Sequence, residues 1–328
     1  MTFLWASTTL HGDPLCFIDR GAGAITATLL FSPDGLVSVR NGAGDIEYID
    51  GRDFVVDAGA GVITRTANSR IPLVGRDELA AIDEPDDRFR RRQVHATYPH
   101  RAGQWQGYVP PFSAGSLPRT ISLLRAGRPL TLAITGDSIA EGYNASGFEG
   151  VPPHQPPYPG LVAGALTETY GSTIALRNFA VAGSTADGGG DAENVTAARP
   201  DLVIVAFGMN DSGYATAPDF AASVSRIVSD VRDEAPAAEF VLVSSMLPNP
   251  AFRYPIIERF AEYRAVLAAL CGPGIVLADV TAMWTDLLRR KSVYDLTGNG
   301  INHPNDFGHQ VYAQVIFGLL TRQVRAQR

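Results

Sequence analysis

The stretch Leu132-Ala-Ile-Thr-Gly-Asp-Ser-Ile-Ala-Glu-Gly142 joins an apolar run to a glycine, an acid and a serine, and then to residues that favour a helix. The pattern places Ser138 at a strand-to-helix turn. There the hydroxyl projects from the carboxyl end of a sheet, and the backbone N–H of the same residue is one of the unpaired donors of a helix start. The stretch alone is equally compatible with a serine that only caps a helix.

Beyond about residue 113, apolar runs of strand length alternate with helical patterns. The candidate strands cover residues 132–135, 173–179, 202–207, 240–245 and 275–278. Candidate helices begin at Thr216-Ala-Pro-Asp219, near Ile256 and near Asp306, and the last carries Arg322, Arg325 and Arg328 near its end. The alternation predicts a parallel sheet with helices on both faces. Ligands of such sheets bind beyond the carboxyl ends of the strands.

Three later stretches extend the pattern around Ser138. They are Asn178-Phe-Ala-Val-Ala-Gly183, Phe207-Gly-Met-Asn-Asp211 and Asn302-His-Pro-Asn305. With Gly136-Asp-Ser138 they follow the order of the sequence blocks of SGNH (GDSL-type) hydrolases, and the chain resembles that superfamily from about Leu117 to its C-terminus. The resemblance implies an α/β, three-layer, flavodoxin-like domain with a five-stranded parallel sheet, and a serine esterase activity.

Acyl transfer from an ester needs a nucleophile, a base and donors aimed at the oxygen that becomes negative. Ser138 is the candidate nucleophile. His303 is the candidate base because its Pro-Asn context fits the catalytic histidine of the family, and His309 is the rival. For the oxyanion hole, the resemblance assigns the Ser138 N–H, the Gly183 N–H and the Asn210 side-chain amide. The plainer alternatives are an ordinary turn at Gly183 and an Asx turn at Asn210.

The last block departs from the family pattern, in which an aspartate three residues before the histidine orients its ring. Gly300 occupies that position here. Some family members have a serine-histidine dyad in which a backbone carbonyl holds the imidazole, and Gly300 or a neighbour could supply that carbonyl. Asp295, Asn299 and Asp306 are the alternative partners of His303, and their spacing does not choose among them.

The first 112 residues have a different pattern. Short runs with strand propensity recur about every ten residues, at 26–31, 36–40, 46–49, 54–56 and 62–66, with Asn-Gly and Asp-Gly turns between them. They predict an all-β sandwich, jelly-roll-like, over residues 1–112. Helix and strand breakers at 109–118 place the boundary there, and residues 113–328 form the predicted SGNH hydrolase domain.

Composition narrows the possible partners. A net charge of −7 and a pI near 5.4 argue against nucleic acid. The basic run Arg88, Arg90, Arg91 and Arg92 lies beside Glu84, Asp86 and Asp87, so we interpret it as solvated or salt-bridged. Cys16 and Cys271 fit neither a disulfide framework nor a metal site, His95 and His100 match no metal pattern, and no cofactor is expected. No apolar run has the length of a membrane span, and no leader is visible, so a cytoplasmic location is expected unless a leader was trimmed.

The combination of a β domain with an SGNH-type domain, and the dyad-like last block, resemble carbohydrate esterases. The expected substrate is therefore a short acyl ester, acetyl above all, on a carbohydrate. A GDSL-type lipase, lysophospholipase or thioesterase is one alternative, and a catalytically silent glycan-binding protein is another. Residues 144–158, with His154, are expected to wall the site, and Trp105 and Tyr108 are candidates either for sugar stacking or for interdomain packing.

Overall fold

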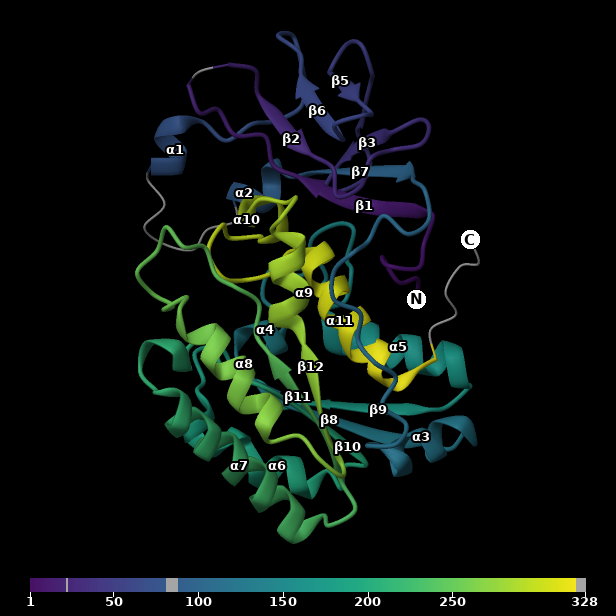
Figure 1. Ribbon diagram of the computed structural model, residues 1–328, viewed down its shortest axis with the longest axis vertical. Coiled ribbons are helices and arrows are strands. Elements are labelled where there is room, and N and C mark those ends of the chain that lie inside the picture. The colour runs from purple at the N-terminus through teal and green to yellow at the C-terminus, as the bar shows by residue number, and fades with distance from the viewer. Residues whose placement is uncertain (22, 81–87, 323–328) are drawn as a thin grey trace.

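The structure, a computed structural model, describes residues 1–21, 23–80 and 88–322 (Figure 1). A five-stranded parallel sheet forms its lower half, in the order β12-β11-β10-β8-β9. The strands are β8 (Leu130–Gly136), β9 (Ile174–Asn178), β10 (Leu202–Ala206), β11 (Glu239–Ser244) and β12 (Ile275–Asp279). Strand β9 pairs with one edge of β8, and β10, β11 and β12 then follow on the other edge, which is the flavodoxin-like strand order. The predicted α/β fold is confirmed.

Side chains of the central strands alternate between two apolar layers. Leu132 and Ile134 of β8 enter one buried cluster, whereas Ala133 between them enters the other. Because successive residues of a strand point to opposite faces, an apolar run without polar interruptions is what a strand covered on both faces requires. The sequence pattern that predicted the sheet therefore also predicted its double cover.

Helices lie on both faces of this sheet and beyond the carboxyl ends of its strands (Figure 1). They are α3 (Pro118–Arg125), α4 (Ser138–Glu141), α5 (Tyr158–Tyr170), α6 (Ala192–Ala197), α7 (Ala217–Glu234), α8 (Arg259–Ala269), α9 (Val280–Leu287), α10 (Val293–Leu296) and α11 (Asp306–Leu320), with 3-10 turns η1 (Ala186–Asp191) and η2 (Asp211–Gly213). Thr216 caps α7 as predicted, because its side chain accepts a hydrogen bond from the Asp219 N–H. The helix expected near Ile256 begins at Arg259 instead, and the Ile256 N–H bonds to the Ser212 hydroxyl.

Two antiparallel sheets precede the α/β part and form the upper half of Figure 1. One has the order β1-β7-β3-β4 and the other β2-β6-β5. Their strands are β1 (Thr9–Leu15), β2 (Thr26–Thr28), β3 (Ser38–Asn41), β4 (Glu47–Tyr48), β5 (Phe54–Asp57), β6 (Val62–Arg65) and β7 (Val94–Pro99). The antiparallel character is confirmed. Strand β1 was not predicted. Gly12 adopts a φ of +69° and the register with β7 shifts between Leu10 and Asp13, so the alternation of apolar and polar residues is interrupted.

Two short helices interrupt these sheets, α1 (Arg76–Ala80) and α2 (Arg88–Arg92). The basic run is thus helical, and Arg92 forms an ion pair with Glu78 at 2.5 Å, in agreement with a salt-bridged segment. Glu84, Asp86, Asp87, Arg325 and Arg328, which entered the sequence predictions, lie outside the described residues.

The two halves share one apolar core. A single buried cluster contains Leu10 and Val39 of the antiparallel sheets together with Trp284 of α9 and Val311 of α11. Lys291, the only lysine of the chain, crosses the junction and forms an ion pair with Asp13 at 2.8 Å, with both side chains fully buried. The boundary after residue 112 remains a prediction, since the change of sequence pattern there is not a break in the core.

Among the described residues, no helix combines the length and apolar character needed to cross a bilayer.

Candidate active site

Ser138 is the first residue of α4, directly beyond β8. Asp137 caps the helix, since its Oδ1 accepts a hydrogen bond from the Ile139 N–H at 3.0 Å. Gly136 makes the turn possible, because a Cβ there would lie 2.5 Å from the Ala206 carbonyl oxygen of the neighbouring strand. The sharp strand-to-helix turn predicted from the sequence is therefore what presents the Ser138 side chain, which is 6% exposed.

The structure brings Ser138 and His303 together across 165 positions of the chain, with 2.8 Å between the Ser138 Oγ and the His303 Nε2. His303 lies in the loop between α10 and α11. Asn305 caps α11 by accepting from the Gly308 N–H, which fixes the exit of this loop. The Tyr143 ring packs beside the imidazole at a centroid distance of 5.3 Å.

The other ring nitrogen of His303 faces Asn299. The Asn299 Nδ2 lies 3.1 Å from the His303 Nδ1. The Asn299 Oδ1 accepts from three backbone N–H groups, those of Ile301, Asn302 and His303, at 3.0, 3.0 and 3.1 Å. These three donors fix which end of the amide is oxygen, so the NH2 end is the one that faces the imidazole.

The other suggested partners of His303 are engaged elsewhere. The Gly300 carbonyl accepts from the Asn249 Nδ2 at 2.8 Å, and the His303 Nδ1 faces the Asn299 amide rather than this carbonyl. Asp295 takes part in the capping box of α10 and accepts from the Cys16 N–H at 2.7 Å. Asp306 accepts from the Ser146 N–H at 2.7 Å. Asn299 is the candidate that reaches the ring.

His309, the rival base, is fully buried in α11. Its Nδ1 accepts from the Tyr158 N–H at 3.3 Å, and its Nε2 lies 3.0 Å from the Tyr143 carbonyl oxygen. Both ring nitrogens thus hold backbone groups of the segment that follows Ser138, and burial lowers the pKa of His309 to about 4. The residue has a structural role.

The oxyanion candidates lie on two loops that are tied to each other. The Asn210 Nδ2 donates to the Ser184 carbonyl at 2.9 Å, which leaves its second hydrogen for another acceptor. The Ala182 N–H donates to Glu141 at the end of α4, at 2.6 Å, and so anchors the loop of Gly183 to the helix of Ser138. Gly183 has a φ of +80°, which favours glycine, although a Cβ would meet no atom within 4 Å.

A second carboxylate supports these loops. Asp211 accepts from the Ala186 N–H at 2.8 Å and from the Gly208 N–H at 3.0 Å, so it joins the segments after β9 and β10. Burial raises its pKa, and burial raises the pKa of Asp137 to about 7. Nothing in the spacing of Asp211 in the sequence signals such a long-range anchor.

Sequence reasoning missed Gln93, which supports the His303 loop from the N-terminal half. The Gln93 Nε2 donates to the carbonyls of Tyr294 and Thr297, both at 2.7 Å, and its Oε1 accepts from the Asn305 Nδ2 at 2.9 Å. Phe89 lies so close that a Cβ at Gly300 would be 2.4 Å from its ring. A lone glutamine beside a strand carries no sequence signal for such a role.

Burial also shapes the electrostatics of His303, the candidate base. Desolvation lowers the pKa of His303 to about 4, because burial disfavours the imidazolium. A neutral amide at Nδ1 supplies no negative charge to oppose this shift. Neutral imidazole is therefore the dominant form at neutral pH, as a base requires.

The loop of residues 144–158 lies beside the active pair, because Phe148 contacts the Tyr143 ring at a centroid distance of 5.0 Å. Gln155 and Ser146 bind it to Asp306 at the start of α11. His154 is solvent-exposed, and its own N–H bonds to the Val151 carbonyl.

Trp105 and Tyr108 pack at the junction of the two halves, where the Trp105 Nε1 donates to the Tyr108 carbonyl and the Tyr108 N–H to Asp286 of α9. These contacts correspond to interdomain packing, the second of the two roles suggested from the sequence.

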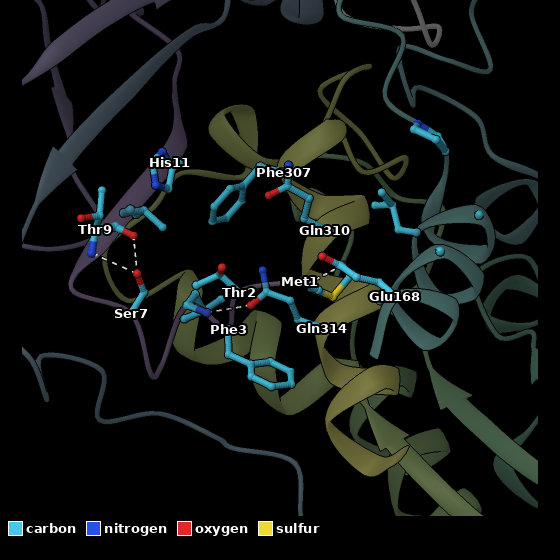
Figure 2. Close-up of a pocket in the computed structure, with 17 residues that line it drawn as sticks. Met1, Thr2, Phe3, Ser7, Thr9, His11, Glu168, Phe307, Gln310 and Gln314 are labelled. Atoms are coloured by element: carbon cyan, nitrogen blue, oxygen red, sulfur yellow. Dashed lines mark hydrogen bonds and ion pairs between the residues drawn. The ribbon is translucent and has the colours of Figure 1, made fainter. Parts of the chain in front are cut away.

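A cavity of about 500 Å³ lies elsewhere, between the N-terminal residues and helices α5 and α11 (Figure 2). Met1, Phe3 and His11 line it together with Phe307 and Gln310 of α11, and Met1 lies beside Glu168 of α5. None of the four active-site candidates lines this cavity. In the described part of the chain, no group of three or more His, Cys, Asp or Glu side chains could hold a metal ion.

Comparisons place the fold among known hydrolases. An esterase with two domains, active on acetylated mannans, is 21% identical with a TM-score of 0.51, over 68% of this chain and 57% of that one. A catalytic mutant of an acetylxylan esterase from Geobacillus stearothermophilus is 21% identical with a TM-score of 0.50, over 62% of this chain and 100% of that one. Identities this low show the fold alone. A comparison with curated proteins found no match.

The family model called GDSL-like Lipase/Acylhydrolase family matches residues 134–311. This match spans more than half of the 328 residues and includes Ser138, Gly183, Asn210 and His303. The chain therefore belongs to the GDSL-like lipase/acylhydrolase family, a family of carboxylic ester hydrolases.

Proposed function

We propose that this esterase cleaves short acyl esters, acetyl esters above all, through an acyl-enzyme on Ser138 with His303 as the base. The observation that carries the proposal is the 2.8 Å contact between the Ser138 Oγ and the His303 Nε2. The pair lies beyond the carboxyl end of β8, beside the strand β10 at which the sheet order reverses, which is where ligands of such sheets bind.

The proposed chemistry has two stages. The Ser138 Oγ bonds to the acyl carbon, its proton passes to the His303 Nε2, and the carbonyl electrons move onto the oxygen. When the tetrahedral intermediate collapses, the alcohol leaves with the proton from Nε2. Water then repeats the sequence on the acyl-enzyme and releases the acid.

Three donors are proposed to stabilise the negative oxygen: the Ser138 N–H, the Gly183 N–H and the Asn210 Nδ2. The anchors of Asp211 and Glu141 hold their loops in place before substrate arrives. Such preorganisation matters because donors that are already oriented need no rearrangement in the transition state. Each one contributes on the order of 3 kcal/mol.

Carbohydrate is the proposed alcohol. Tyr214 and Tyr254 form a tilted pair of rings, 5.8 Å between centroids, and their exposed fractions are 79% and 43%. The Tyr254 hydroxyl donates to the Asn210 carbonyl at 2.9 Å, so the aromatic pair adjoins the proposed oxyanion hole. Exposed aromatic rings suit the apolar C–H faces of sugars. An esterase of similar fold is active on acetylated mannans, which supports a carbohydrate as the alcohol.

An acyl-length series tests this proposal. We expect hydrolysis of p-nitrophenyl esters to be fastest with acetyl and to fall with longer chains, and we expect acetate release from acetylated mannan or xylan oligosaccharides. Ser138→Ala should reduce both rates by at least about 10³-fold. Rates that rise with acyl length would identify a lipase or thioesterase instead. Full activity of Ser138→Ala would refute Ser138 as the nucleophile.

A catalytically silent glycan-binding protein is the second candidate. It is favoured by one observation, namely that His303 has an amide rather than a carboxylate at Nδ1. This candidate predicts binding of acetylated oligosaccharides without turnover of any ester in the series.

A further inference from the structure

The hydrogen bonds around Asn299 determine where its amide protons point. The side chain is 2% exposed, so its polar atoms depend on protein partners. Its Oδ1 accepts from three backbone N–H groups of the loop 301–303. Its Nδ2 lies 3.0 Å from the Asn302 Oδ1 and 3.1 Å from the His303 Nδ1. Rotating the amide would set the NH2 group against three N–H donors, so this orientation is strongly preferred.

This orientation selects one tautomer of His303. An N–H that points at Nδ1 needs a lone pair there, and a protonated Nδ1 would place two donors against each other at 3.1 Å. In neutral imidazole the proton must then be on Nε2. The His303 Nε2 therefore donates to the Ser138 Oγ in the resting protein, whereas the base that accepts the serine proton needs a lone pair at Nε2.

We propose that Asn299 is a positioning residue that holds neutral His303 with its proton on Nε2, so that the Ser138–His303 pair rests in a non-attacking state. This inference rests on the proposed esterase function. Before each attack the proton must move to Nδ1, against the amide of Asn299. The native protein should accordingly hydrolyse esters more slowly than a variant in which the proton of neutral His303 rests on Nδ1.

Asn299→Asp should release this restraint with almost no change of shape. One carboxylate oxygen can keep the three backbone N–H donors, and the other can accept from a protonated Nδ1. Asn302 can match the new acceptor by rotating its own amide. The substitution would therefore create the Ser-His-Asp arrangement that the loop lacks. In a serine protease with a Ser-His-Asp triad, the reverse change, Asp to Asn, costs about 10⁴-fold in kcat because the histidine takes the wrong tautomer.

The experiment combines kinetics with ¹⁵N NMR of His303 in the full-length protein. We expect Asn299→Asp to raise kcat on p-nitrophenyl acetate by at least about 10-fold. We also expect the proton of neutral His303 to move from Nε2 in the native protein to Nδ1 in the variant. Asn302→Asp is the matched control. It adds the same charge next to His303, and its carboxylate can still accept the hydrogen bond from the Asn299 Nδ2. It should leave the proton of neutral His303 on Nε2 and should not raise kcat.

Two results would overturn the proposal: native His303 with its proton on Nδ1, or a folded Asn299→Asp variant whose kcat is unchanged or lower. Adding Ser138→Ala to Asn299→Asp should abolish the gain, which shows that the added rate passes through Ser138. If neither protein hydrolyses any ester, the esterase proposal fails, and the NMR tautomer still decides the role of Asn299.

Discussion

Lys291→Met removes one partner of the ion pair that joins the antiparallel sheets to the α/β part. In the native protein the Lys291 Nζ lies 2.8 Å from the Asp13 Oδ1 and donates to the Thr28 carbonyl at 2.7 Å. The Asp13 Oδ2 accepts from the Leu30 N–H and the Tyr98 hydroxyl, both at 2.7 Å. Methionine fills similar space but leaves a buried carboxylate without its cation.

The expected cost follows from this burial. Breaking a buried ion pair from one side costs about 3–5 kcal/mol, because the remaining charge stays desolvated. With a shift of about 2–4 °C per kcal/mol for a large domain, the melting temperature should fall by roughly 6–20 °C. Asp13→Asn in the same chain removes the unpaired buried charge, so the double variant should recover at least about 1 kcal/mol relative to Lys291→Met.

Urea unfolding followed by circular dichroism measures these differences. Arg40→Met is the matched control, since Arg40 pairs with Glu47 at 2.8 Å but both side chains are about half exposed, at 50% and 54%. It should cost less than about 1 kcal/mol. If Lys291→Met lowers the free energy of unfolding no more than Arg40→Met does, the buried pair does not couple the two halves. The same conclusion follows if adding Asp13→Asn to Lys291→Met lowers this free energy further.

Three further predictions concern the active site. The kcat/KM of the native protein should stay level from pH 7 to about pH 5 and fall below that. The reason is that only neutral imidazole accepts a proton, and burial lowers the pKa of His303 to about 4. A pH–rate profile in which kcat/KM already falls at pH 6.5 or above would contradict this. Asn210→Ala should lower kcat by roughly 10²- to 10³-fold with a smaller change in KM, as steady-state kinetics on p-nitrophenyl acetate would show, and an unchanged kcat would remove Asn210 from the oxyanion hole. Gln93→Leu should lower kcat by roughly 10- to 100-fold, because the Tyr294 and Thr297 carbonyls lose their donor and the His303 loop shifts. Kinetics equal to those of the native protein would show that the N-terminal half does not support the loop.

Patterns with local causes were predictable from the sequence. Residues 132–134 are apolar on both faces because both faces of β8 are covered. The Gly-Asp-Ser turn follows from the close approach of Gly136 to Ala206. Ser138 and His303 could be paired only through the order of the blocks, because no local signal joins residues 165 positions apart.

Long-range polar contacts were not predictable. Gln93, Asp211 and Lys291 each act on segments far away in the chain, and such partners leave no periodicity. Strand β1 was missed because Gly12 and the register shift interrupt its alternation. Asn299 was one of several possible partners of His303, and only the three donors to its Oδ1 decide both its position and its orientation.

Covalent labelling with a serine-directed fluorophosphonate probes the Ser138–His303 pair most directly. The modified residue is mapped by mass spectrometry of peptides, in the native protein, in Asn299→Asp and in His303→Ala. Labelling at Ser138 is expected in the first protein and faster in the second, and it should be lost in the third because the hydroxyl has no base. Labelling of another serine, or equal labelling of Ser138 with and without His303, would contradict a nucleophile and base at this position.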